Sequence, residues 1–180
     1  MKPAWNIKKP KPRGVVATYD AKPGELLEID GLQWAHPVTG RQCRGQLMVD
    51  VGSRLPVIKV FEETRGKITS NNTAIECRDA LINDWLMHKP RPKTVRLDPD
   101  GAYVSNVMLE AITGLHLDVQ VTPPEAPWHL SVLGIVSQLI KRTAELYALD
   151  EGIKASCQEC LIMACLAHSR LLKHGGDSPL

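Results

Sequence analysis

Two aspartates each follow a short apolar run that is typical of a β-strand, and their carboxylates are well suited to bind a metal ion. Asp30 ends the run LLEID, and Asp98 ends the run TVRLD. If these strands are neighbours in a sheet, both carboxylates can share one hard cation, because Mg²⁺ takes few protein oxygens and keeps several waters. Aspartates are also common where strands give way to turns. For either residue alone a structural role is therefore favoured, and the recurrence of both in one layout shifts the balance towards metal binding.

The segment PWHLSVLGIVSQLIKRTAELY, residues 127–147, has the periodicity of an amphipathic helix. Its predicted apolar face consists of Leu133, Val136, Ile140 and Tyr147. Gly134, Ser137 and Lys141 follow one another at i, i+3 and i+7, which places them on one stripe beside that face. Lys141 should therefore point along the same side of the helix as Ser137.

The elements that position these residues are predicted from apolar runs and turn residues. Strands are expected in ELLEIDGLQW, ending near Asp30, and in CRGQLMVDVG, LPVIKVFEE, KTVRLD and LDVQVTP. Helices are expected at about 72–88, 105–115, 129–149 and 153–172. This order predicts an α/β fold with a mixed five-stranded sheet flanked by helices.

The first predicted helix carries its own local signals. Ser70 or Asn71 is expected to cap its N-terminus. Its buried stripe is expected to comprise Ala74, Cys77, Leu81, Trp85 and His88. Trp34 and Trp85 are expected to lie in the core or in a dimer interface.

Composition indicates one globular domain preceded by a basic arm. The chain has 180 residues, of which 43% are hydrophobic, and no apolar run approaches the roughly 20 residues that span a bilayer. The net charge of +2 alone does not indicate nucleic acid, but five basic residues precede the first acidic one, Asp20. Residues 1–22 are predicted to be a proline-rich arm, either solvated or following a phosphate backbone, and residues 23–180 the domain. The odd number of cysteines, five, favours reduced thiols in an intracellular protein.

Five segments together resemble, in their order and spacing, the integrase catalytic core of LTR retrotransposons and retroviruses: LLEIDGLQW, LMVDVGSRLPVIKVF, VRLDPDGAYVS, EAPWHLSVLGIVSQLIKR and HGGDSP. The resemblance spans residues 23–179. It implies a ribonuclease-H-like fold and a site of two aspartates and a glutamate that cuts and joins DNA with Mg²⁺ or Mn²⁺. Asp30 and Asp98 match the two catalytic, metal-binding aspartates. Asp50 matches an acidic position that binds no metal, and Asp100 is assigned no metal role. A homodimer or higher homo-oligomer, and a nuclear location when acting on DNA, are also implied.

The third acid of this family falls on Ser137, within GIVSQLIKR. A neutral hydroxyl replaces a carboxylate there, which should weaken the second metal site. The chain is therefore expected to be an impaired polynucleotidyl transferase core; the alternative is a non-catalytic DNA-binding or scaffolding module derived from one. Glu125 and Glu145 do not match the third position. The resemblance makes Lys141 and Arg142 the expected DNA contacts, with a solvated lysine as the alternative for Lys141.

Cys157 and Cys160 form a C-x-x-C, with His168 and His174 downstream, which invites a zinc-site interpretation. The two cysteines lie within one predicted helix, where i and i+3 share a face with apolar residues. Buried free cysteines are common in cores, so a packing role is the favoured interpretation.

Overall fold

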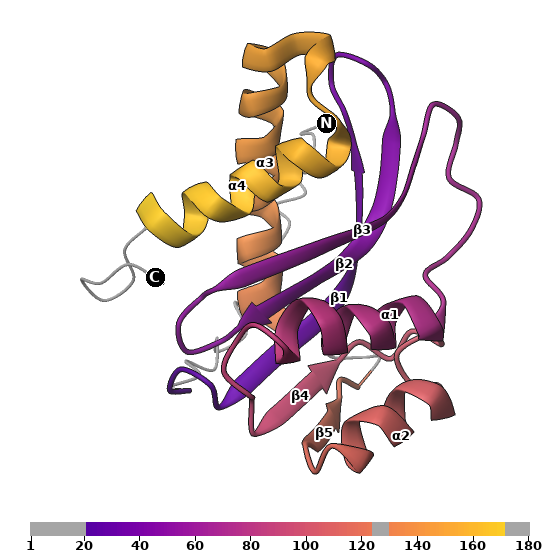
Figure 1. Cartoon of the computed structure of the whole chain (residues 1–180), viewed down its shortest axis with the longest axis vertical. Helices are drawn as coiled ribbons and strands as arrows, with labels where there is room; N and C mark the ends of the chain where they lie inside the picture. Colours follow the sequence, from indigo (N-terminus) through magenta and orange to yellow (C-terminus); the bar gives the residue numbers. More distant parts are fainter. Residues whose placement is uncertain (1–20, 124–129, 172–180) are drawn as a thin grey trace, which may run out of the picture.

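The computed structural model describes residues 21–123 and 130–171, and its strands form a five-stranded sheet in the order β3-β2-β1-β4-β5 (Figure 1). The strands are β1 (Leu26–Ala35), β2 (Gln42–Asp50), β3 (Pro56–Thr64), β4 (Thr94–Leu97) and β5 (Asp118–Val121). The first three pair antiparallel, whereas β4 joins β1, and β5 joins β4, in parallel. The predicted mixed sheet is confirmed.

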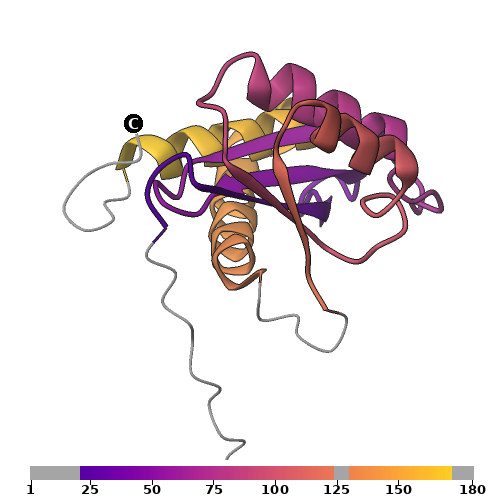
Figure 2. The same cartoon turned by 90° about the horizontal axis from the view of Figure 1, so that it is seen from below.

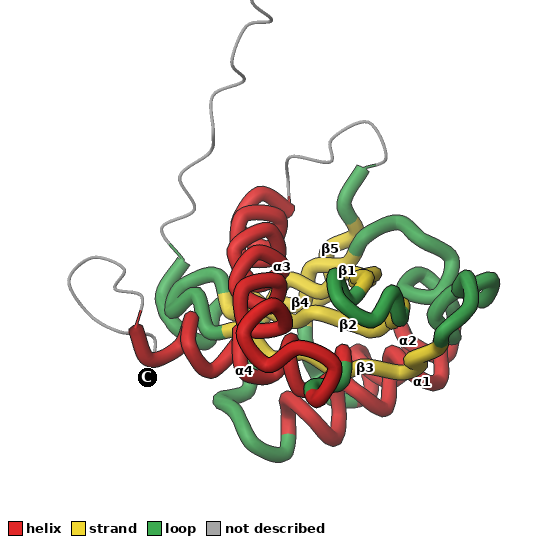
Figure 3. The backbone as a smooth tube through the Cα atoms, turned by 90° about the horizontal axis from the view of Figure 1, so that it is seen from above, coloured by secondary structure: helices red, strands yellow, loops and turns green. Residues whose placement is uncertain are grey.

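Helices cover both faces of this sheet. They are α1 (Ala74–Ala80), continued by the π-helical η1 (Leu81–Leu86), then α2 (Asn106–Gly114), α3 (Ser131–Glu151), the 3₁₀ turn η3 (Gly152–Lys154) and α4 (Cys157–Leu171). Figures 2 and 3 show α3 on the side of the sheet opposite to α1 and α2. No helix among the described residues is long and apolar enough to cross a bilayer.

Strand β1 separates two cores because its side chains alternate between the faces of the sheet. Leu32 and Trp34 pack with α3 and α4, whereas Leu27 and Ile29 pack with α1 and α2. Trp85 lies in the second core, and both tryptophans are buried, as expected of core residues.

The prediction that the first strand ends near Asp30 is wrong. Parallel pairing with β4 stops at Ile29 and Leu97, but antiparallel pairing with β2 continues to Ala35. Asp30 thus lies inside β1, next to the point where the parallel neighbour β4 ends. Asp98 directly follows β4.

The cap of the first helix also differs from its prediction. Thr73, rather than Ser70 or Asn71, is the N-cap, and it forms a capping box in which its hydroxyl accepts from the Glu76 N–H while the Glu76 carboxylate accepts from the Thr73 N–H. Ser70 instead donates to Glu62.

The predicted buried stripe of this helix holds only in its middle. Cys77, Leu81 and Trp85 are buried, but Ala74 is partly exposed and His88 is exposed. The helix becomes π-helical after Ala80, and the Met87 N–H donates to the Ile82 carbonyl, five residues back. Because the wider turn shifts the angular spacing, His88 does not continue the stripe.

The break between the last two helices begins later and is longer than the sequence suggests. Gly152 has φ +67°, a left-handed conformation that ends α3 at Glu151. The turn η3 follows, so α4 begins at Cys157 instead of near Ile153.

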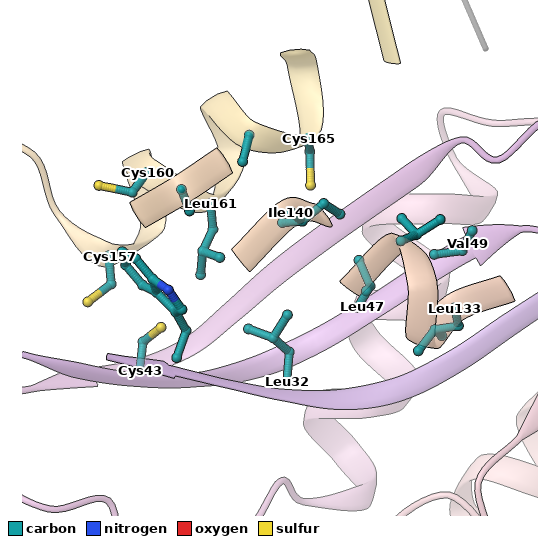
Figure 4. Packing of buried hydrophobic residues seen from close by; sticks show 14 of the residues in the cluster. Leu32, Cys43, Leu47, Val49, Leu133, Ile140, Cys157, Cys160, Leu161 and Cys165 are labelled. Atoms are coloured by element: carbon teal, nitrogen blue, oxygen red, sulfur yellow. The ribbon is translucent and has the colours of Figure 1, made fainter. Parts of the chain in front are cut away.

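The C-x-x-C cysteines belong to the core between the sheet, α3 and α4 (Figure 4). Burial raises the pKa of Cys160 to about 11, and hydrogen bonding with Cys43 is the main cause that raises the pKa of Cys157, so both stay protonated. His168 bonds through Nε2 to the Arg54 carbonyl, 3.0 Å away. Among the described residues, no cluster of three or more histidine, cysteine or acidic side chains could hold a metal.

Candidate active site

Asp30 and Asp98 come together because their strands are parallel neighbours in register. Ile29 and Leu97 are the last residue pair between β1 and β4, so each aspartate directly follows the parallel pairing of these two strands. Adjacent strands lie about 4.8 Å apart. The two aspartates therefore lie on neighbouring strand positions at the carboxyl end of β4, near enough for the charge of Asp98 to raise the pKa of Asp30.

A buried ion pair two residues before Asp30 shows which face of the sheet this part of β1 presents to α3. The Arg96 guanidinium donates to Glu28 Oε1 at 3.0 Å, and the Leu133 N–H of α3 donates to Glu28 Oε2 at 2.9 Å. Glu28 therefore faces α3. Because side chains two residues apart in a strand share a face of the sheet, Asp30, which lies inside β1, also faces α3.

The Glu28 carboxylate acts as a cap for α3 that comes from another element. Leu130, at the helix N-terminus, provides no side-chain cap, and Leu133 lies in the first turn, where N–H groups lack helical partners. Burial raises the pKa of Glu28, while the Leu133 N–H and Arg96 act against that rise. The start of α3 is thus tied to β1 two residues before Asp30.

The electrostatics of the site are those of clustered, partly buried acids. Burial raises the pKa of Asp30 to about 6, and the charges of Asp98 and Asp100 act in the same direction. The Gly31 N–H, 2.6 Å from Asp30 Oδ1, and the charge of Lys141 lower it. Burial, followed by the charge of Asp100, likewise raises the pKa of Asp98. Such a cluster favours the binding of a cation.

Helix α3 places Lys141 and Ser137 on the side of the aspartates. Lys141 is near enough to Asp30 for its charge to lower the pKa of that carboxyl. Ser137 precedes it by one turn, and both side chains are partly exposed. The predicted apolar face of the helix is confirmed, since Leu133, Val136 and Ile140 are buried. Figure 1 shows α3 passing behind β1 and β2.

A pocket of about 300 Å³ opens beside Asp30. Its lining combines backbone and apolar surface with acidic and amide side chains: Asp30, Gly31, Leu32, Gln33, Asn71, Asn72 and Asp100. A Cβ at Gly31 would lie in ordinary van der Waals contact with this wall, 3.4 Å from Asn72 Nδ2. The pocket can therefore hold a polar group next to Asp30.

Arg44 on β2 holds the asparagine wall of this pocket in place. Its guanidinium donates to Glu62 at 2.8 Å, to Asn72 Oδ1 at 3.3 Å and to both oxygens of Glu76, at 2.9 and 3.0 Å. Asn72 in turn donates to the Gly45 carbonyl at 2.7 Å. One buried cation thus joins β2, β3 and the start of α1.

Replacing Arg44 with methionine should lower the free energy of unfolding by about 2–4 kcal/mol, because the acids around it lose their counter-charge. The hydrogen bond from Arg44 is the main cause that lowers the pKa of Glu76 to about 2, from an ordinary 4.5. This contribution is therefore complete above pH 4.5 and is lost as the pH falls towards 2. Urea unfolding at pH 7 and pH 3 measures it.

The control for this prediction is Arg78→Met, which breaks the half-exposed pair with Asp79 and should cost about 1 kcal/mol or less. In a Glu76→Gln protein, the free energy of unfolding should differ less between pH 7 and pH 3 than it does in the wild type. An Arg44→Met protein as stable as the wild type at pH 7 would contradict the assigned role.

The residues present fit one divalent cation. Asp30 and Asp98 supply the one or two carboxylates that Mg²⁺ takes from a protein, with water completing its shell. Within residues 21–123 and 130–171, no third acidic side chain lies close enough to Asp30 and Asp98 to complete a metal-binding group of three.

The other acidic and basic candidates have different surroundings. Asp50 pairs with Leu27 near the start of β1 and accepts hydrogen bonds from the Gly24 and Ser53 N–H groups, a structural role that fits the absence of a metal role. Glu145 and Arg142 are exposed on α3, and Arg142 lies about 100° around the helix from Lys141. Glu125 and His174 lie outside the described residues.

The sequence did not single out the amides of the pocket or Asp100 as members of the site. Gln33 lies beyond the predicted end of the first strand, and Asn71 and Asn72 were considered only as the cap and the start of the first helix. Asp100 follows Asp98 in the turn PDG, and its charge acts on both aspartates. Its position two residues after Asp98 was the signal in the sequence that could have placed Asp100 at the site.

Comparison with known proteins gives similarity in structure alone. No protein-family model and no curated protein matches the sequence. A chain of the simian T-cell lymphotropic virus intasome, solved in complex with PP2A regulatory subunit B56 gamma, superposes with a TM-score of 0.73 at 19% identity over 88% of this chain, which spans only 53% of that one.

Two isolated integrase catalytic cores superpose over nearly their whole length. The HTLV-2 core, solved in complex with magnesium in a dimeric form, gives a TM-score of 0.69 at 14% identity, with 88% of this chain and 94% of that chain covered. The BIV core gives 0.67 at 15% identity, with 87% and 91% covered. The predicted ribonuclease-H-like fold is confirmed: this chain has the fold of retroviral integrase catalytic cores.

Proposed function

We propose that the chain is an integrase-type polynucleotidyl transferase core, derived from an LTR retrotransposon or retrovirus-like element, whose catalytic activity is impaired. The observation that carries the proposal is that Asp30 and Asp98 lie on neighbouring strand positions at the carboxyl end of β4, where Asp30 faces α3. The fold supports it, since the similar structures are integrases. The substrate is DNA, which implies action in the nucleus, and the protein works as a homodimer or higher homo-oligomer.

Asp30 and Asp98 would hold one Mg²⁺ or Mn²⁺ ion, and Ser137 occupies the position from which a third carboxylate would hold a second. When bound, a pair of such cations activates the attacking oxygen and stabilises the leaving one. Ser137 can offer only a short, neutral hydroxyl, so the second cation is held weakly. The chain therefore binds DNA ends but joins them poorly.

The test is a DNA-nicking and strand-joining assay with increasing Mn²⁺. The wild-type chain should bind duplex DNA and give nicking and joining near background at every concentration of metal. Efficient metal-dependent joining by the wild type would contradict the impairment. DNA binding that requires neither Mn²⁺ nor Asp30 would favour the second candidate function, a non-catalytic DNA-binding or scaffolding module. This second candidate is also supported by the described residues, in which no third acid is grouped with the two aspartates.

Lys141→Ala should weaken DNA binding and reduce the slope of log affinity against log salt by about one unit, because one phosphate contact is lost. Lys141 lies on the side of α3 next to Asp30, where a phosphate near the metal would lie. Arg142 is proposed as a second, weaker contact. Fluorescence anisotropy with a labelled duplex over a salt series measures the slope.

The matched control is Lys154→Ala, which removes an exposed lysine from η3, beyond the far end of α3. Its salt slope should equal that of the wild type. Equal slopes for Lys141→Ala and the wild type would show that Lys141 is a solvated lysine.

A further inference from the structure

A hollow lies at the end of the sheet where β1 and β4 begin, whereas the aspartates lie where β4 ends. Its volume is about 340 Å³, and its apolar walls are Pro23, Leu55, Trp85 and Pro90. Leu55 and Trp85 belong to the core that packs with α1 and α2, whereas Asp30 faces α3. The Trp85 hollow, as these walls define it, is therefore separate from the candidate active site.

The π-helical turn η1 and the segment that follows it build one side of the Trp85 hollow. The Nε1–H of Trp85 donates to the Pro90 carbonyl at 3.2 Å, which holds the indole ring in the wall. Met87, which is 69% exposed, directly precedes the lining residue His88. π-helical turns are rare and frequently occur at functional sites, and an exposed methionine adapts its shape to what it contacts.

The mouth of the Trp85 hollow carries positive charge. His88 and Lys89 line it, and Arg91 is exposed two residues after Lys89. In the part of the chain that the structure describes, neither Lys89 nor Arg91 forms an ion pair with an acid. Asp50 also lines the hollow, but it is buried and accepts hydrogen bonds from two backbone N–H groups and a serine hydroxyl. The cations are thus available to an acidic ligand.

We infer that the Trp85 hollow binds an acidic peptide segment of a partner protein. The segment inserts one large apolar side chain into the hollow and places acidic residues against Lys89 and Arg91. A volume near the lower end of the range for ligand sites, roughly 300–1,000 Å³, suits one such side chain. The buried side chain supplies most of the affinity, and the charges supply orientation and the rate of association. This surface goes beyond the proposed function, which does not use it.

The shape of the hollow favours a peptide over a nucleic acid. A nucleic acid is held by many phosphate contacts, or by aromatic rings whose faces are free to stack on bases. Trp85 is only 2% exposed, and the prolines of the walls have no aromatic ring. Lys89 and Arg91 provide two cations, fewer than a duplex requires. An inserted side chain needs neither an open ring nor a long row of cations.

The first experiment follows the indole N–H signal of Trp85 in ¹⁵N-labelled protein during addition of a peptide with one phenylalanine between two runs of three glutamates. The signal should shift and saturate, because the indole ring forms a wall of the hollow. A peptide with alanine in place of the phenylalanine should bind at least about tenfold more weakly, and one with lysines in place of the glutamates should not bind. A signal that no peptide shifts, or equal binding of the phenylalanine and alanine peptides, would overturn the inference.

The second experiment reverses the charge at the mouth. Lys89→Glu with Arg91→Glu should weaken binding of the glutamate peptide at least about tenfold, because the mouth then repels it. Arg65→Glu with Lys67→Glu changes two exposed basic residues at the same spacing in the loop after β3 and should leave binding unchanged. Equal weakening by both double variants would show attraction by net charge alone. Duplex DNA that shifts the Trp85 signal when the peptide does not would show a nucleic-acid site. Either result overturns the inference, and neither experiment measures metal binding or strand joining, so failure here leaves the proposed function standing.

Discussion

Replacing Ser137 with glutamate is expected to raise Mn²⁺-dependent joining of DNA strands by about a hundredfold or more over the wild-type chain. The new carboxylate would stand on α3 above Asp30 and Asp98 and hold the second cation. Stabilising the transition-state charge with a metal ion contributes several kcal/mol, and each 1.4 kcal/mol is about tenfold in rate. A joining or disintegration assay with labelled oligonucleotides at saturating Mn²⁺ measures the gain.

Two variants show whether that gain comes from a metal-binding carboxylate. Ser137→Gln adds a side chain of the same size without the charge and should stay at the wild-type level. Ser137→Glu combined with Asp30→Asn should lose the gain, because the shared ligand is then missing. If Ser137→Glu and the wild type joined strands equally slowly, Ser137 would not stand at the third acidic position.

Replacing Glu28 with alanine is expected to lower the free energy of unfolding by about 3–5 kcal/mol, the largest effect on stability predicted for the chain. The change leaves the Arg96 guanidinium buried without its carboxylate and the Leu133 N–H without its acceptor. Urea unfolding followed by circular dichroism gives the loss. Hydrogen exchange at the first turn of α3 should increase in the same variant.

The effect should come from the unpaired partner and not from the loss of a carboxylate as such. Glu28→Met combined with Arg96→Met removes both charges together and should recover much of the stability. Glu110→Ala removes an exposed carboxylate on α2 and should change little. A stable Glu28→Ala protein with an unchanged first turn of α3 would mean that Glu28 does not position this helix.

The order of strands and helices could be predicted because each apolar run has the length and periodicity of its element. Asp98 follows β4 as predicted, since that strand is short and ends at a Pro-Asp-Gly turn. The end of β1 could not be predicted in this way. It depends on pairing with β2, which continues after β4 has ended, and residue types within β1 do not show how far a neighbour extends.

The parts of the site that depend on tertiary contacts were also missed. In the sequence Glu28 interrupts an apolar strand. Its role depends on Arg96 and on Leu133 of α3, which are 68 and 105 residues away in the chain. Arg44 likewise joins three elements. The capping box of Thr73 and Glu76 was also missed, but it could have been predicted from the sequence. It has the local pattern of threonine followed three residues later by glutamate.

The most direct test of the two-aspartate site counts the Mn²⁺ ions bound per chain by calorimetry and electron paramagnetic resonance. One ion is predicted for the wild type, none for Asp30→Asn and two for Ser137→Glu, with Asp50→Asn retaining the wild-type count. Binding that survives Asp30→Asn, or a count that Ser137→Glu leaves at one, would contradict an active site in which two strand carboxylates face a helix that lacks its acid.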